Sequence, residues 1–139
     1  RGNFWIVEGI ACQMESLKLH DDFAELGGSD NPRMLAARAR FKANYYMPLV
    51  DFTALSRDQL QKNPDIKALY SQASGLASFL MYGEQGKYRE ATVDFLDAIY
   101  TNKDTPLTLT QRIGRSYSEL DADYRRYLES LPGPVPELK

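Results

Sequence analysis

The strongest constraint on the fold is a run of apolar residues spaced three and four positions apart between positions 64 and 82. This spacing places the side chains on one face of an α-helix, whereas a strand exposed on one side alternates with a period of two. The run consists of Ile66, Leu69, Tyr70, Ala73, Leu76, Ala77 and Leu80. No segment of useful length alternates with period two. The sequence therefore predicts an all-α fold, in which strands are neither needed nor excluded at the margins.

Gly75 lies inside this predicted helix, within a stretch of small residues that extends from Ala73 to Ser78. A glycine in a helix interior costs about 1 kcal/mol relative to alanine. We therefore expect another element to pack closely against the helix backbone at this point. Gly83 and Gly86 are expected to end the helix.

A second helix is predicted from about Asn3 to Leu19, with apolar residues on most of its circumference. A helix that is apolar nearly all round is normally buried, so we expect this one at the centre of the fold. Glu8 lies in the middle of the apolar run. An ionisable group in such a place needs a partner, a metal ion or a shifted pKa, which makes Glu8 the most informative residue of the chain.

Further helices are predicted over about 32–44, 56–62, 88–100, 109–113 and 118–131, with loops at 21–29 and 102–106. Ser56 with Gln59 has the spacing of a capping box, and Ser118 is taken as the N-cap of the last helix. The length of 139 residues fits one hydrophobic core. We expect a single irregular multi-helix domain over 1–131 and a proline-rich tail over 132–139.

Composition excludes some classes of partner. The net charge of −2 argues against a nucleic-acid-binding surface, and the one cationic cluster is interpreted as a solvated helix face. That cluster consists of Arg33, Arg38, Arg40 and Lys42. No apolar run approaches the ~18 residues of a membrane span. The single cysteine, Cys12, lies in an apolar stretch and is expected to be buried, and it leaves the compartment undetermined.

Most motifs that carry enzyme chemistry are absent from the sequence, including phosphate-binding glycine loops, the G-x-S-x-G elbow and C-x-x-C. The only histidine is His20, beside Asp21 and Asp22, where a solvated position at a helix end is expected. One imidazole cannot assemble a catalytic zinc site. We therefore expect this chain alone to bind no zinc and to show no peptidase activity.

One motif remains. Trp5, Glu8, Gly9 and Ala11 form a W-x-x-E-G-x-A pattern. This pattern resembles the third-ligand motif of gluzincin (peptidase-MA-like) zinc metallopeptidases, the superfamily that includes thermolysin and aminopeptidase N. In those enzymes an H-E-x-x-H helix gives two ligands and a general base, and a glutamate on a later helix gives the third ligand. The resemblance implies that Glu8 is that ligand.

The resemblance continues along the chain, from about Phe4 to Leu131. In these proteins the glutamate is followed by a helix that contains a tyrosine, then small residues, then the pair F-L, and the segment from Tyr70 to Leu80 is similar to that helix. Ile113-Gly114 resembles the end of the same domains. The nearest likeness is to uncharacterised bacterial families of unknown function. The resemblance implies that Tyr70 donates a hydrogen bond to an oxyanion during catalysis.

The sequence contains no H-E-x-x-H. Because it opens on Arg1 without a methionine, we expect a chain cut from a longer protein that holds zinc and hydrolyses peptide or protein substrates. Because the missing helix would uncover apolar residues beside Glu8, the cut chain is also expected to self-associate or to cover them with a segment of its own.

Other interpretations stay open. Glu8 can be a buried structural carboxylate, Tyr70 a core aromatic, and Glu15 either a group that orients a ligand or a surface residue. The chain itself can be a non-catalytic helical binding or scaffold domain, such as a degenerate relative of the peptidases, or part of a helical-repeat array.

Overall fold

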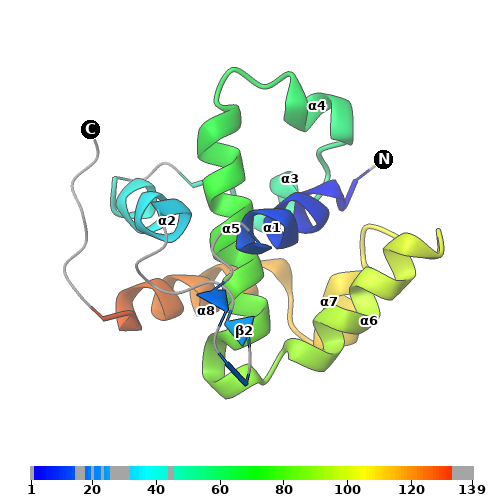
Figure 1. Ribbon diagram of the computed structural model, residues 1–139. Helices are drawn as coiled ribbons and strands as arrows, with labels where there is room; N and C mark the ends of the chain where they lie inside the picture. Colours follow the sequence, from blue (N-terminus) through cyan, green and yellow to red (C-terminus); the bar gives the residue numbers. More distant parts are fainter. Residues whose placement is uncertain are drawn as a thin grey trace.

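The computed structural model describes residues 2–14, 18–19, 21–22, 24–25, 32–43 and 46–132. Apart from one pair of two-residue strands, its regular elements are helices, so the predicted all-α fold is confirmed (Figure 1). In chain order these are α1 (Phe4–Met14), β1 (Lys18–Leu19), β2 (Ala24–Glu25), α2 (Pro32–Lys42), α3 (Leu49–Phe52), α4 (Arg57–Gln61), α5 (Ile66–Tyr82), the 3-10 turn η1 (Gly83–Gly86), α6 (Arg89–Tyr100), α7 (Thr108–Ile113) and α8 (Tyr117–Ser130).

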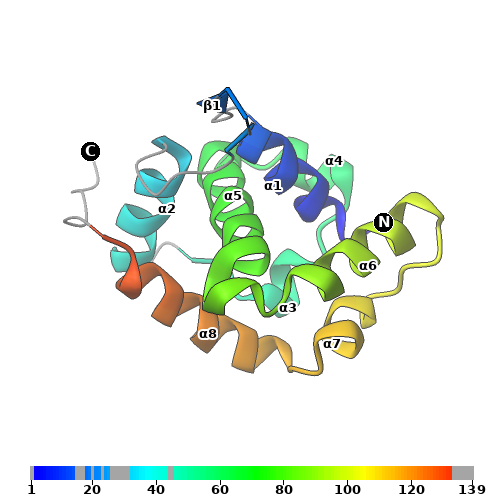
Figure 2. The same ribbon diagram turned by 60° about the horizontal axis from the view of Figure 1, so that its bottom comes forward.

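The central element is α5, in which every residue from Ser71 to Leu80 is buried. The predicted core positions Leu69, Ala73, Leu76 and Leu80 all lie in the hydrophobic core. In Figure 1, α1 crosses in front of α5, α2 lies on its left, and α6 and α7 lie on its right. Figure 2 shows α8 running along the near edge of the fold below α2 and α5. The helix with the clearest apolar pattern is therefore the one around which the others pack.

Gly75 marks one point where α5 is approached closely. A Cβ built on it would lie 3.1 Å from the Cβ of Ala37 in α2 and closer still to the hydroxyl oxygen of Tyr124 in α8. The predicted close packing at Gly75 is confirmed. A stripe of small residues lets two neighbouring helices contact the same turn of α5.

Capping residues fix the ends of two helices. Ser56 and Gln59 form the predicted capping box at the start of α4. The prediction that Ser118 caps the last helix is wrong, because Ser116 does so. The hydroxyl of Ser116 accepts the Glu119 backbone N–H at 3.1 Å, and the Glu119 carboxylate accepts the Ser116 N–H at 3.0 Å. Two hydrogen bonds at Ser116 outweigh a hydroxyl two residues later.

The predicted helix from Asn3 to Leu19 is too long. The helix α1 ends at Met14, and Lys18–Leu19 pair antiparallel with Ala24–Glu25. Because Ala24 and Glu25 form a strand, the prediction of a loop over 21–29 is wrong at these two residues. The pairing gives the backbone of these residues hydrogen-bond partners outside a helix. His20 and Glu15, whose roles were considered above, and residues 133–139 of the predicted tail lie outside the described residues.

The prediction that α1 is buried all round is also wrong. Trp5, Ile6, Gly9 and Cys12 are buried against the rest of the fold, whereas Phe4, Val7, Glu8 and Ile10 are only half-buried. In the part of the chain that the structure describes, no element covers this second face completely. An apolar circumference on α1 therefore produces one core face and one partly exposed apolar face.

The cationic cluster is a solvated face only in part, because Lys42 is exposed whereas Arg33 and Arg40 are half-buried. Arg38 is buried at 4% exposure, and its guanidinium donates hydrogen bonds to the carbonyl oxygens of Leu131 and Pro132, at 3.3 and 3.1 Å. It thereby joins α2 to the end of α8.

Among the described helices, none is both long enough and apolar enough to cross a lipid bilayer.

Candidate functional site

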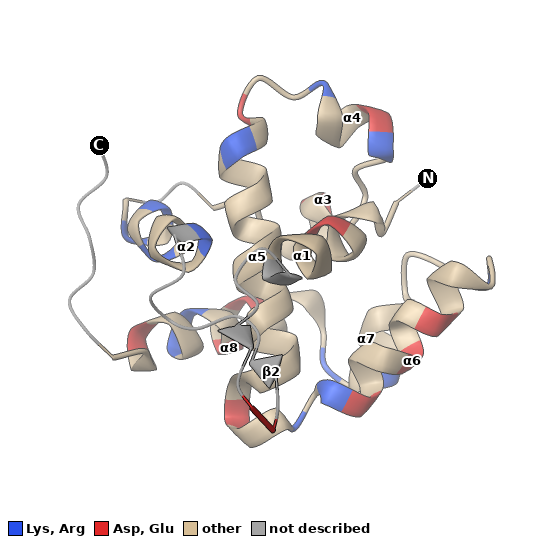
Figure 3. Cartoon of the chain, in the orientation of Figure 1, with Lys and Arg blue, Asp and Glu red and all other residues tan. Residues whose placement is uncertain are grey.

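The half-exposed face of α1 carries the candidate site. Glu8 is the one charged residue of this helix, and it lies between Phe4 and Val7 on one side and Ala11 on the other. Figure 3 shows how sparse charge is in α1 and in the middle of α5, compared with the outer helices. Among the described residues, Glu8 forms no ion pair with a lysine or arginine. Glu8 is thus a half-buried carboxylate on an apolar face, without a cationic partner among the described residues.

Two packing features hold this face in place. Gly9, the next residue, faces α5, where a side chain would meet the Ala73 carbonyl. Trp5 is fully buried, with its ring centroid 5.7 Å from that of Phe52 and 6.4 Å from that of Phe95. The backbone of α1 is therefore fixed on both sides of Glu8. A side chain on a rigid helix is positioned more accurately than one on a loop.

Tyr70 of α5 lies close enough to Glu8 for their charges to interact. Burial raises the pKa of Tyr70 above its ordinary value, and the charges of Glu8 and Cys12 raise it further, while Arg33 and Arg57 act in the opposite direction. The two residues that the sequence resemblance assigned to one site therefore lie within electrostatic reach of each other, although 62 positions separate them in the chain.

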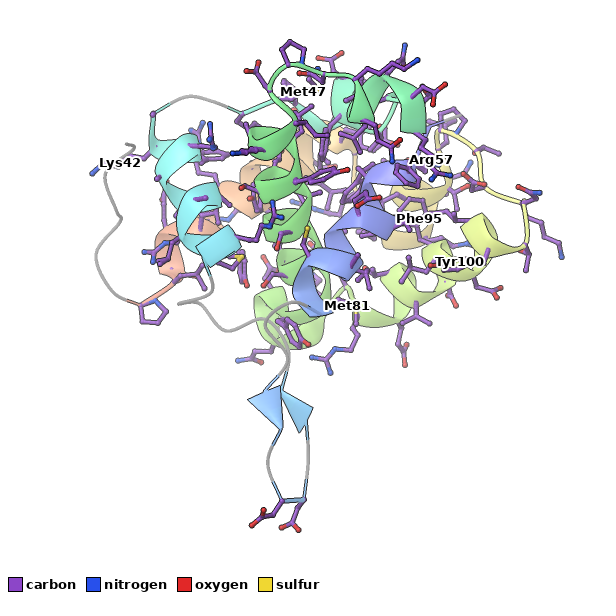
Figure 4. The ribbon with its side chains drawn as sticks, turned by 45° about the horizontal axis from the view of Figure 1, so that its top comes forward. Lys42, Met47, Arg57, Met81, Phe95 and Tyr100 are labelled. Carbon is purple, nitrogen blue, oxygen red and sulfur yellow. The ribbon has the colours of Figure 1, made fainter. Side chains whose placement is uncertain are left out.

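Two arginines, from two further helices, complete the surroundings. The guanidinium carbon of Arg33, in α2, lies 5.8 Å from the centre of the Tyr70 ring. That of Arg57, in α4, lies 5.5 Å from the centre of the Phe4 ring. Figure 4 labels Arg57 where α4 meets the first turn of α1. Sequence reasoning placed Arg33 on a solvated face and passed over Arg57, because nothing in the sequence around Arg57 signals that α4 folds back onto α1.

A cavity of about 440 Å³ opens beside Arg57, between the start of α1, α4 and the end of α6. Its walls include Phe4, Ser56, Arg57, Asp58, Ile99 and Asn102. Phe4 lies one helical turn before Glu8 on the same face of α1, so the cavity and the carboxylate are neighbours along the helix. Phe4 and Ile99 are its apolar walls, and the other four of these residues are polar or charged.

The described residues do not form a complete metal site. No group of three or more histidine, cysteine, aspartate or glutamate side chains in that part of the chain could hold a metal ion. Glu8 nevertheless fits the role of a single carboxylate ligand, since it has no cationic partner there and lies on a partly exposed face. Zinc prefers ligand sets that combine nitrogen, sulfur and carboxylate oxygen, and the remaining ligands would have to come from outside the described residues.

A second charged cluster has a structural explanation. Asp123 of α8 is buried and accepts hydrogen bonds from Tyr88, Arg115 and Arg126. Its bonds to the Arg115 guanidinium measure 3.1 and 2.9 Å. Because several donors satisfy this buried carboxylate, the cluster joins α8 to α6 and does not resemble a ligand site.

No model of a known protein family matches the chain, and neither a curated protein sequence nor a solved structure is similar enough to count as a match.

Proposed function

We propose that this chain is the C-terminal helical part of a gluzincin-type zinc peptidase, in which Glu8 is the carboxylate ligand and Tyr70 an oxyanion donor. The observation that supports the proposal most is the Glu8 carboxylate itself. It lies on the half-exposed face of α1 without an ion pair to another described residue, and within electrostatic reach of Tyr70. The proposal requires two imidazole ligands and a general base from a segment that is not among these 139 residues.

The carboxylate suits the chemistry that is proposed. Zinc held by two neutral imidazoles and one carboxylate keeps a fourth position for a water molecule that it can ionise. The role of Glu8 is to place one negative oxygen ligand at a fixed point. The contact of Gly9 with α5 supports this role, because it prevents α1 from sliding or rotating on its neighbour.

Tyr70 suits the second role. A tyrosine phenol is protonated at neutral pH, and the raised pKa of Tyr70 keeps it protonated in more alkaline solution as well, so its hydroxyl can donate a hydrogen bond. A donor of this kind stabilises the negative oxygen that develops when water attacks a peptide carbonyl. The partly exposed apolar residues of α1, Phe4, Val7 and Ile10, offer a surface on which a further helix can pack beside Glu8.

The test begins with the reading frame that encodes this chain. An H-E-x-x-H motif upstream of Arg1 is expected, and the protein from the complete frame is then purified as wild type and as Glu8→Gln. A neutral amide is a poor zinc ligand, so the variant should lose both zinc and hydrolysis of a casein substrate. Glu90→Gln, an exposed residue of α6, is the matched control and should keep both.

If Glu8→Gln binds as much zinc as the wild type does, Glu8 is not a zinc ligand. In that case the non-catalytic helical binding domain is the better hypothesis, as it also is if the complete frame encodes no H-E-x-x-H. Metal analysis by atomic emission and a peptidase assay on the same preparations separate these cases.

A further inference from the structure

A second cavity, of about 490 Å³, lies where the start of α1 meets α3 and the segment that connects α6 to α7. Its walls include Val50 and Leu107, which are large apolar side chains with 57% and 56% of their surface exposed. Pro106 and Tyr117 add further apolar surface. Small-molecule sites in proteins measure about 300–1,000 Å³ and combine apolar walls with a few polar groups. The size and lining of this cavity, called the Asn3 cavity below, fall within that class.

Asn3 is a wall residue whose side chain is only partly satisfied. It is buried at 3% exposure, and its Nδ2 donates hydrogen bonds to Asp104 Oδ2 at 2.9 Å and to the Thr105 carbonyl at 3.0 Å. Because both partners are acceptors, they determine which end of the amide is the nitrogen. The other end, Oδ1, is buried and accepts no hydrogen bond from the described residues. A buried acceptor in this condition needs an explanation, and a donor from a ligand would supply one.

The hydroxyl groups of the walls are already engaged. Tyr117 donates to the carbonyl of Pro106, Thr53 donates to that of Leu49 at 2.8 Å, and the Thr105 hydroxyl shares a hydrogen bond with that of Thr108 at 3.3 Å. Asp104 is the one charged side chain among the described walls, and a carboxylate can accept about four hydrogen bonds. The acceptors Asn3 Oδ1 and Asp104 therefore favour a ligand that donates hydrogen bonds and carries a positive charge.

We propose that the Asn3 cavity binds a primary ammonium group carried on a small apolar body. The ammonium donates to Asn3 Oδ1 and lies near the Asp104 carboxylate, while Val50 and Leu107 cover the apolar part. A free amine and the N-terminal residue of a peptide share this chemistry. The site involves neither Glu8 nor zinc, so the inference goes beyond the proposed function and does not depend on it.

The experiment titrates the 139-residue chain, without zinc, in mildly acidic solution, where amines are protonated. Three probes share one apolar body. Phenethylamine has both a charge and N–H donors, phenethyl alcohol has a donor but no charge, and trimethylphenethylammonium has a charge but no N–H. Phenethylamine is expected to bind about tenfold more tightly than either of the others, and to shift the side-chain amide signals of Asn3 in the NMR spectrum. Phenylalanyl-glycinamide, a peptide with a free N-terminal ammonium, then shows which source of the ammonium is preferred.

Two variants separate the contributions of the donor and the charge. Asn3→Gly removes the acceptor, and glycine tolerates the backbone there, where φ is 65°. It should abolish the preference for phenethylamine over the trimethyl compound. Asp104→Asn should abolish the preference for phenethylamine over the alcohol, because it removes the negative charge.

Each variant has a matched control outside the walls of the cavity. Asn102→Gly changes an exposed asparagine whose φ is 60°, and Asp94→Asn changes an exposed aspartate of α6, and both should keep the two preferences. Equal affinities of the wild type for the three phenethyl probes, or unchanged Asn3 signals with phenethylamine, would overturn the inference whether or not the variants fold. The zinc content of Glu8→Gln is unaffected by that result, so the two proposals fail separately.

Discussion

Gly9 of α1 lies directly against the backbone carbonyl of Ala73 in α5. A Cβ built on Gly9 would lie 3.0 Å from the Cβ of Ala77 and closer still to the Ala73 oxygen. Backbone atoms cannot move aside as a flexible side chain can, so this contact sets the distance between the two helices. That distance in turn fixes where Glu8 stands relative to Tyr70.

Gly9→Ala is therefore expected to destabilise the protein by about 1–3 kcal/mol, the usual cost of forcing an extra carbon into a packed interior. At an unhindered helix position the same change would stabilise it by about 1 kcal/mol, because alanine has the higher helix propensity. Urea unfolding followed by circular dichroism measures the sign. A stabilised Gly9→Ala variant would show that the two helices are not in contact here.

Gly75 provides a second packing test, with a built-in control. Its hydrogen atom leaves room for the hydroxyl of Tyr124, so Gly75→Ala should cost stability, whereas Tyr124→Phe removes the obstructing oxygen. In the double variant the added methyl group meets less resistance, and we expect a favourable coupling energy of about 0.5–3 kcal/mol between the two changes. Four urea curves, for the wild type, both single variants and the double variant, give that energy. Simple additivity would contradict the contact.

These two glycines show how far the sequence predicts the packing. The small residues around Gly75 indicated that some element approaches α5, because a helix interior rarely keeps a glycine without reason. They could not indicate that the approaching group is the hydroxyl of Tyr124, 49 positions further along the chain, since that contact depends on how α8 crosses α5. Gly9 is part of the W-x-x-E-G-x-A motif, but its packing against α5 is evident only from the structure.

The sequence likewise predicts the helix ends but only part of the candidate site. Ser56 and Ser116 both have a glutamine or glutamate three residues later, so local spacing determines both caps and favours Ser116 over Ser118 as the N-cap of α8. That Glu8 and Tyr70 belong to one site stays a prediction, made from the resemblance to a family. Arg57 could not be found in this way, because its position depends on a short helix whose orientation no local pattern specifies.

The raised pKa of Tyr88 predicts that the protein loses stability in alkaline solution. Burial, followed by its hydrogen bond to Asp123, raises the pKa of Tyr88 from 10.0 to about 12. A pKa that is higher in the folded state means that this group contributes stability in full below pH 10.0 and loses it as the pH rises through about 12. Tyr88→Phe should therefore lose less stability than the wild type across that interval. Urea unfolding at several pH values within the interval measures the difference, and parallel curves would contradict the assignment.

Glu8→Gln in the 139-residue chain tests whether this carboxylate has a structural role. Among the described residues, Glu8 forms neither an ion pair nor a side-chain hydrogen bond, so we expect the free energy of unfolding to change by no more than about 0.5 kcal/mol. A structural carboxylate bonded to a buried donor would instead cost about 1–3 kcal/mol. Asp123→Asn is the positive control, because it breaks a buried ion-pair cluster and should cost about 3–5 kcal/mol. A large loss in Glu8→Gln would favour the scaffold hypothesis, since a residue kept for metal binding does not need to stabilise the chain that lacks the metal.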